Sequence, residues 1–119
     1  MTLIFSNWVE KQIRLAPNDI CAFVFNLYEE RGAFSVEIVG AKAFSSDNPD
    51  WACREDFVPS PRRRWSIPME LSGSNWESCL AAMQLDIREL LEMGKIGRLV
   101  SAEAVALGFV DGDLYVLKP

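Results

Sequence analysis

Two neighbouring apolar segments joined by a polar turn constrain this chain more than any other feature. Residues 20–28 are rich in aromatic and β-branched types, which favours a strand buried on both faces. Residues 29–32 are polar and include a glycine, and residues 34–42 then alternate, with Ser35 and Glu37 opposite the apolar positions. The apolar positions are Phe34, Val36 and Ile38. The pattern predicts a β-hairpin.

A second hairpin is indicated near the end of the sequence. The dipeptide Asp111-Gly112 separates apolar residues 102–109 from residues 114–118, and Asp-Gly is a strong turn signal between strands. The segment 104–107 is an alternative helix, because Ala and Leu favour helical structure. We prefer a strand there, because the turn needs two partners.

Two helices are expected, and the stronger signal covers residues 75–93. Ser74 with Glu77 three positions later forms a capping-box pattern, and Gly94 suits the C′ position. Residues 2–15 predict a shorter amphipathic helix, which Pro17 follows. The apolar stripe of the longer helix is Trp76, Leu80, Met83, Ile87, Leu90 and Leu91, and that of the shorter helix is Leu3, Ile4, Trp8 and Ile13.

These segments together predict one α+β domain that spans residues 1–119. The order is helix, two strands, a long loop, helix and two strands. Strands joined by hairpins favour an antiparallel sheet of four or more strands, with the two main helices packed on one face. A length of 119 residues fits a single domain.

The long loop, residues 45–64, has an acidic, turn-forming start and a basic end. We expect one short strand at 51–57, in which Trp51, Cys53 and Phe57 either face inward or flank a binding site. The segment from Trp65 to Pro68 is expected to be briefly extended.

The residue types argue against catalysis and against a bound cofactor or metal. The chain has no histidine and no C-x-x-C pair, which removes the usual triads, the common neutral general base and most zinc sites. The run 47–50 lacks the spacing of a calcium loop. The remaining catalytic alternative is a pair of carboxylates, but Glu55 and Asp56 are adjacent and would point to opposite faces of a strand. We therefore predict a protein that is not an enzyme.

Charge and cysteine content indicate the kind of partner and compartment. The net charge of −5 disfavours nucleic acid and anionic membranes and matches a basic protein surface, although mild acidity also serves solubility. Three widely spaced cysteines make a poor disulfide framework. The start of the chain lacks signal-peptide features, and no apolar run reaches the length of a membrane span. We expect a cytoplasmic protein.

The candidate binding residues are mainly acidic. Carboxylates grouped near an aromatic anchor could pair with Lys or Arg of a partner, and two further acids flank the predicted turn, where they could instead serve turn geometry. The run Arg62, Arg63 and Arg64 is the one basic cluster, and its alternatives are a phosphate site or pairing with nearby acids. The candidate residues are Asp47, Asp50, Trp51, Glu55, Asp56, Asp111 and Asp113.

Two segments resemble a known class of protein. Residues 50–57, read as D-W-A-C-x-E-x-F, and residues 108–114, read as G-F-x-D-G-D-L, are similar to segments of bacterial immunity proteins associated with polymorphic toxins, contact-dependent inhibition and type VI secretion. The resemblance implies an antidote that binds and blocks a cognate toxin or effector. The run from Arg62 to Arg64 departs from a uniformly acidic binding face. A non-catalytic adaptor or regulatory binding domain is the alternative.

Overall fold

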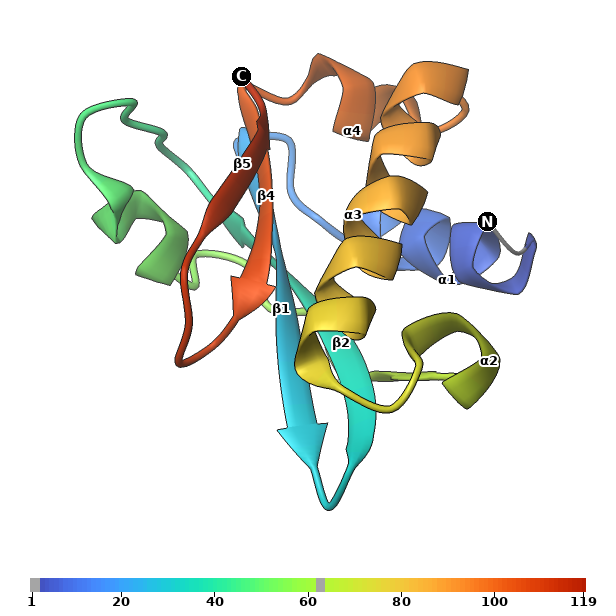
Figure 1. Ribbon diagram of the computed structural model, residues 1–119. Helices are drawn as coiled ribbons and strands as arrows, with labels where there is room; N and C mark the ends of the chain where they lie inside the picture. The colour runs from blue at the N-terminus through green and yellow to red at the C-terminus, as the bar shows by residue number, and fades with distance from the viewer. Residues whose placement is uncertain (1–2, 62–63) are drawn as a thin grey trace.

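A five-stranded sheet in the order β3-β2-β1-β4-β5 forms the centre of the protein (Figure 1). The structure is a computed structural model that describes residues 3–61 and 64–119. The strands are β1 (Ala22–Glu30), β2 (Ala33–Ala41), β3 (Trp65–Ile67), β4 (Ala104–Phe109) and β5 (Tyr115–Lys118). The helices are α1 (Leu3–Arg14), the 3₁₀ helix η1 (Pro49–Cys53), α2 (Met69–Ser72), α3 (Trp76–Met93) and α4 (Gly97–Ser101).

Both predicted hairpins are confirmed. Strands β1 and β2 pair antiparallel up to Glu30 and Ala33. Arg31 and Gly32 between them have φ of 54° and 78°, and left-handed conformations at both positions are what a tight two-residue turn requires. Strands β4 and β5 also pair antiparallel, so the segment 104–107 is strand and not helix.

The predicted antiparallel sheet is confirmed, with one pair of strands that differs. Strands β1 and β4 run parallel, with Ala22 opposite Ala104 and Leu27 opposite Phe109. Between the end of β2 and the start of β4 the chain passes through the long loop, β3 and three helices. A parallel pair needs such a crossover, and α3 supplies a long element that packs on the sheet.

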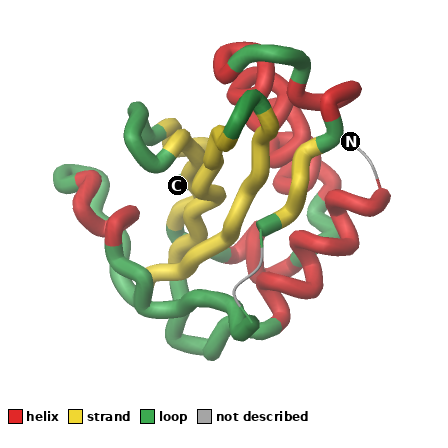
Figure 2. Tube along the Cα trace, turned by 90° about the horizontal axis from the view of Figure 1, so that it is seen from below, coloured by secondary structure: helices red, strands yellow, loops and turns green. Residues whose placement is uncertain are grey.

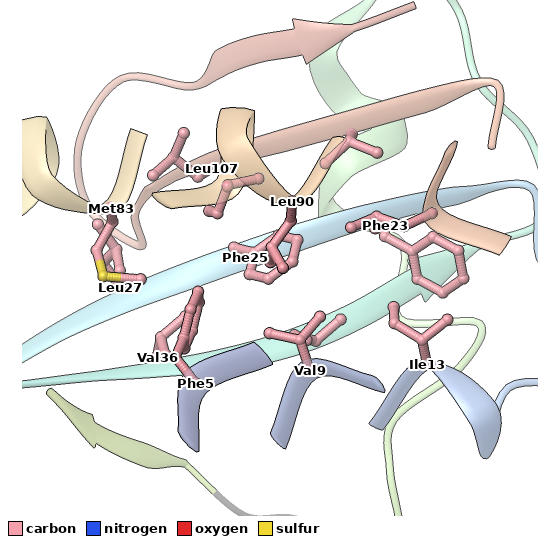
Figure 3. Packing of buried hydrophobic residues seen from close by; sticks show 14 of the residues in the cluster. Phe5, Val9, Ile13, Phe23, Phe25, Leu27, Val36, Met83, Leu90 and Leu107 are labelled. Carbon is pink, nitrogen blue, oxygen red and sulfur yellow. The ribbon is translucent and has the colours of Figure 1, made fainter. Parts of the chain in front are cut away.

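The main core lies between the sheet and its helical face. Helices α1 and α3 pack on the same face, as predicted, and their buried side chains meet those of β1, β2 and β4 (Figure 3). The predicted stripe of α1 is shifted, because Leu3 and Ile4 are 70% and 71% exposed whereas Phe5 and Val9 are fully buried. Ile13 is buried as expected.

The predicted capping box of α3 is also displaced by one residue. The side chain of Asn75, not Ser74, accepts a hydrogen bond from the backbone N–H of Ser78 at 2.8 Å. Gly94 ends the helix in the left-handed conformation with φ of 66°, as predicted. Helix α3 therefore begins at Trp76, which is exposed.

The long loop covers part of the opposite face of the sheet (Figure 2). The expected strand at 51–57 is wrong, because Pro49 and an Asn48 side chain that accepts from the Asp50 N–H start a 3₁₀ helix instead. Among the loop residues that the structure describes, Phe57 alone pairs with the sheet, through two backbone hydrogen bonds to Gly40. Trp51 and Phe57 face inward, whereas Cys53 is exposed.

Candidate functional site

A groove of about 460 Å³ opens between the end of β1, the start of α3 and the turn between β4 and β5. These three segments can be followed in the lower half of Figure 1. We call this groove the end groove. Its walls are aromatic and aliphatic side chains and its rim carries carboxylates. The residues used below are Trp76, Phe109 and Tyr115 on the walls and Glu29, Asp111 and Asp113 on the rim.

Trp76 gives the end groove an exposed aromatic surface. The sequence pattern assigned this residue to the core, but it is 50% exposed. The Trp76 ring packs edge-on against the ring of Phe109, with the ring centres 6.3 Å apart, and Phe109 packs in turn on Phe34, with the ring centres 6.0 Å apart. Tyr115, 37% exposed, also lines the groove. Large aromatic side chains held in place but left half uncovered are typical of binding surfaces.

Three exposed carboxylates stand at the rim of this aromatic surface. Glu29 comes from the end of β1, and Asp111 and Asp113 come from the turn between β4 and β5. The described residues that line the groove include no Lys or Arg. The groove therefore combines an apolar floor with a negative rim, and a cationic side chain with a long apolar stem complements both features.

Backbone contacts fix the turn that carries Asp111 and Asp113. The Gly112 N–H donates to the Phe109 carbonyl at 2.9 Å, and the Val110 N–H donates to the Leu27 carbonyl at 3.2 Å. A Cβ at Gly108 would lie 2.3 Å from the Asp113 carbonyl oxygen. Gly108 is therefore the position where only glycine lets the two sides of the turn approach.

A second groove lies beside β5 on the opposite face of the sheet. Its volume is about 260 Å³, and it is lined by the long loop on one side and by the end of the chain on the other. Phe44, Trp51, Leu114 and Val116 make it mainly apolar. We call it the loop groove.

The seven candidate residues predicted from the sequence separate into two groups. Asp111 and Asp113 lie at the end groove, whereas the other five belong to the long loop. Of these five, Asp47, Asp50, Glu55 and Asp56 are exposed and Trp51 is 5% exposed. The ring of Trp51 packs edge-on against that of Phe44, with the ring centres 5.1 Å apart, so Trp51 helps to hold the loop in place.

Asp56 has an internal role in the long loop. Its carboxylate accepts from the Lys42 backbone N–H at 2.8 Å and pairs with Arg54 Nε at 3.2 Å. The hydrogen bond from Lys42 and the charge of Arg54 lower the pKa of Asp56. This side chain ties the loop to the residue that follows β2, so its contacts serve the fold of the loop.

The basic run is described only at its last residue. The Arg64 guanidinium lies 3.6 Å from the centre of the Tyr28 ring, a cation–π geometry. Arg62 and Arg63 lie outside the described residues. The Tyr28 hydroxyl is 3.2 Å from Glu37, and Glu37 is 1% exposed on the face where a solvated side chain was expected.

Residues 3–61 and 64–119 contain no group of three or more metal-ligating His, Cys, Asp or Glu side chains. No helix in these ranges has the length and apolar character needed to span a membrane.

The fold and the end groove define the protein as an α+β domain with an acidic, aromatic recess at one end of its sheet. Comparisons with known proteins identify no family model, no curated protein and no solved structure that matches the chain.

Proposed function

We propose that this protein acts by binding a basic partner protein at the end groove, and that the partner is a toxin or effector that it neutralises. The observation that carries the binding proposal is the half-exposed Trp76, which lines the same groove as Asp111 and Asp113. Aromatic anchors surrounded by charged side chains are the usual centres of protein interfaces.

The toxin part of the proposal has a separate basis. It depends on the resemblance of residues 50–57 and 108–114 to immunity proteins. The second of these segments contributes Phe109, Asp111 and Asp113 to the end groove. One of the two segments that suggest an antidote thus contributes to the recess. Contact with the toxin, not turnover, is the proposed activity.

Co-expression tests the proposal. The products of the genes directly adjacent to the gene for this protein are each expressed alone and together with this chain, and cell survival and complex formation by gel filtration are measured for any product that is toxic. We expect rescue and co-elution with the wild-type chain, and loss of both with Trp76→Ala combined with Asp111→Lys. Leu85→Ala combined with Glu92→Lys is the matched control, because it changes an exposed apolar residue and an exposed acid elsewhere on α3.

Failure of rescue together with absence of a complex would contradict the proposal. A complex that forms without rescue would instead favour the alternative, an adaptor or regulatory binding domain that uses the same groove. Loss of rescue in the control pair as well would show that the effect is not specific to the end groove, and would contradict the assignment of binding to that groove.

A further inference from the structure

Strand β5 is an open edge of the sheet. It pairs with β4 alone, and no other strand of the described residues lies along its outer side. Tyr115 and Val116 are 37% and 43% exposed, and the strand carries no charge before Lys118. An edge strand presents backbone N–H and C=O groups that a further strand can pair with.

The other edge of the sheet is much less available. Strand β3 has only three residues and is followed directly by Pro68. The part of β2 beyond β3 is bridged at Gly40 by Phe57. Short strands, proline and covering loops are the common ways of blocking strand addition, so β5 is the edge that can accept a partner.

The two grooves flank this same strand. Tyr115 lines the end groove on the helical side, whereas Val116 lines the loop groove on the opposite side. Successive side chains of a strand point to opposite faces. A strand added beside β5 would therefore present alternate side chains to two recesses of different chemistry.

We propose that an extended segment of the partner adds to β5 as a sixth strand, with a Lys or Arg side chain at the end groove and an adjacent apolar side chain at the loop groove. The carboxylates of Asp111 and Asp113 select the basic residue, and Phe44, Leu114 and Val116 select the apolar one. The backbone pairing supplies affinity and the two recesses supply specificity. This inference rests on the proposed function, whose site it specifies.

A partner segment fits this edge better than a second copy of the chain. Each copy has a net charge of −5, and like charges oppose association. Strand β5 has only four residues, so a pair of β5 strands from two copies would be short, whereas a partner segment can also place side chains in both grooves. A dimer seen by sedimentation that is lost in Val116→Asp would overturn the assignment to a partner.

Peptide selection provides the direct test. A library of random ten-residue peptides is selected on the wild-type protein, and the enriched peptide is synthesised unmodified and in two N-methylated forms that block alternate amides. We expect enriched peptides to place Lys or Arg next to an apolar residue. One N-methylated form should lose at least about tenfold in affinity and the other should bind like the parent, because only one edge of the added strand faces β5. No enrichment, or the same effect of both N-methylated forms, would overturn the inference.

Variants of the protein locate the binding and separate the two proposals. Val116→Asp and, independently, Asp113→Lys should each weaken peptide binding about tenfold or more, whereas the controls Leu85→Asp and Glu92→Lys should leave it unchanged. Circular dichroism checks that each variant is folded.

If Val116→Asp and Asp113→Lys both still rescue cells from the neighbouring toxin, strand addition is wrong and neutralisation stands. If peptides bind as expected but wild type gives no rescue, the toxin assignment is wrong and the strand site stands.

Discussion

The three cysteines show how strongly single residues differ in their surroundings. Cys53 is exposed on the long loop, Cys21 is partly buried at the start of β1, and Cys79 is buried in α3 against the sheet. Burial raises the pKa of Cys79 to about 11 and, with a hydrogen bond to Glu103, raises the pKa of Cys21 as well. Thiolate is the reactive form, so neither of these two residues is readily activated.

We therefore predict that thiol reagents modify the three cysteines in a fixed order. At pH 8, iodoacetamide should label Cys53 first, Cys21 more slowly, and Cys79 only when the protein unfolds. Mass spectrometry of peptides from a labelling time course, with a sample in urea as the control, measures the order. Rapid labelling of Cys79 in the folded protein would contradict the packing of α3 on the sheet.

We predict that Asp56 makes a pH-dependent contribution to stability. The Lys42 N–H and Arg54 lower its pKa in the folded protein, so the charged form favours folding. The contribution is complete above the unfolded pKa of about 3.9 and is lost as the pH falls through the lowered folded value. Urea denaturation should show Asp56→Asn to be less stable than wild type at pH 6, with the difference shrinking towards zero at acidic pH. A difference that stays constant with pH would show that the charge of Asp56 has no role.

At the scale of elements, the N-terminal cap of α3 sets the residue at which the helix begins, and so the position of Trp76. The Asn75 side chain caps the helix by accepting from the Ser78 N–H. We predict that Asn75→Ala lowers the free energy of unfolding by about 0.5–2 kcal/mol. Ser74→Ala is the control and should change it by less than about 0.5 kcal/mol. Urea denaturation of both variants measures the difference, and equal effects would favour the capping box of the sequence prediction.

The turn between β4 and β5 offers a matched pair of glycines. A Cβ at Gly108 would meet the Asp113 carbonyl oxygen at 2.3 Å, whereas a Cβ at Gly112 would find its nearest atom at an ordinary 3.5 Å. Gly108→Ala should therefore destabilise the protein by about 1–3 kcal/mol and displace the rim of the end groove. Gly112→Ala should stay within about 0.5 kcal/mol. Thermal unfolding measures the stability of both variants, and the rescue assay tests the end groove. A Gly108→Ala variant with unchanged stability would show that the turn tolerates a shift.

The elements that the sequence predicts well are those set by neighbouring residues. The hairpins, the C-terminus of α3 and the extended segment at β3 depend on local turn chemistry and alternation, and the structure confirms them. The parallel pairing of β1 with β4 depends on where α3 carries the chain, which no local pattern encodes. The end groove could not be predicted either, because it also depends on tertiary structure. In the sequence Trp76 continues the apolar stripe of α3, and only the fold shows that its side chain remains half exposed.

At the scale of the whole molecule, the question is whether the net charge of −5 acts as a general field or through the end groove. Asp113→Lys and Glu92→Lys change the net charge by the same amount, but Glu92 lies sixteen residues along α3 from Trp76. That separation is about 24 Å at 1.5 Å per residue, more than twice the Debye length of about 10 Å in 0.1 M salt. At this ionic strength the end groove is screened from Glu92 but not from Asp113.

We predict that Asp113→Lys slows association with the proposed basic partner about tenfold or more in 0.1 M salt, whereas Glu92→Lys changes the rate less than about twofold. Near 0.01 M salt the Debye length rises to about 30 Å, so Glu92→Lys should then also slow association. At high salt the rate of the wild-type protein should fall towards that of Asp113→Lys, because screening removes the attraction that the variant lacks. Stopped-flow or surface plasmon resonance rates across a salt series measure all three. Equal slowing by the two variants at 0.1 M salt would mean that the overall net charge, and not the carboxylates of the end groove, attracts the partner.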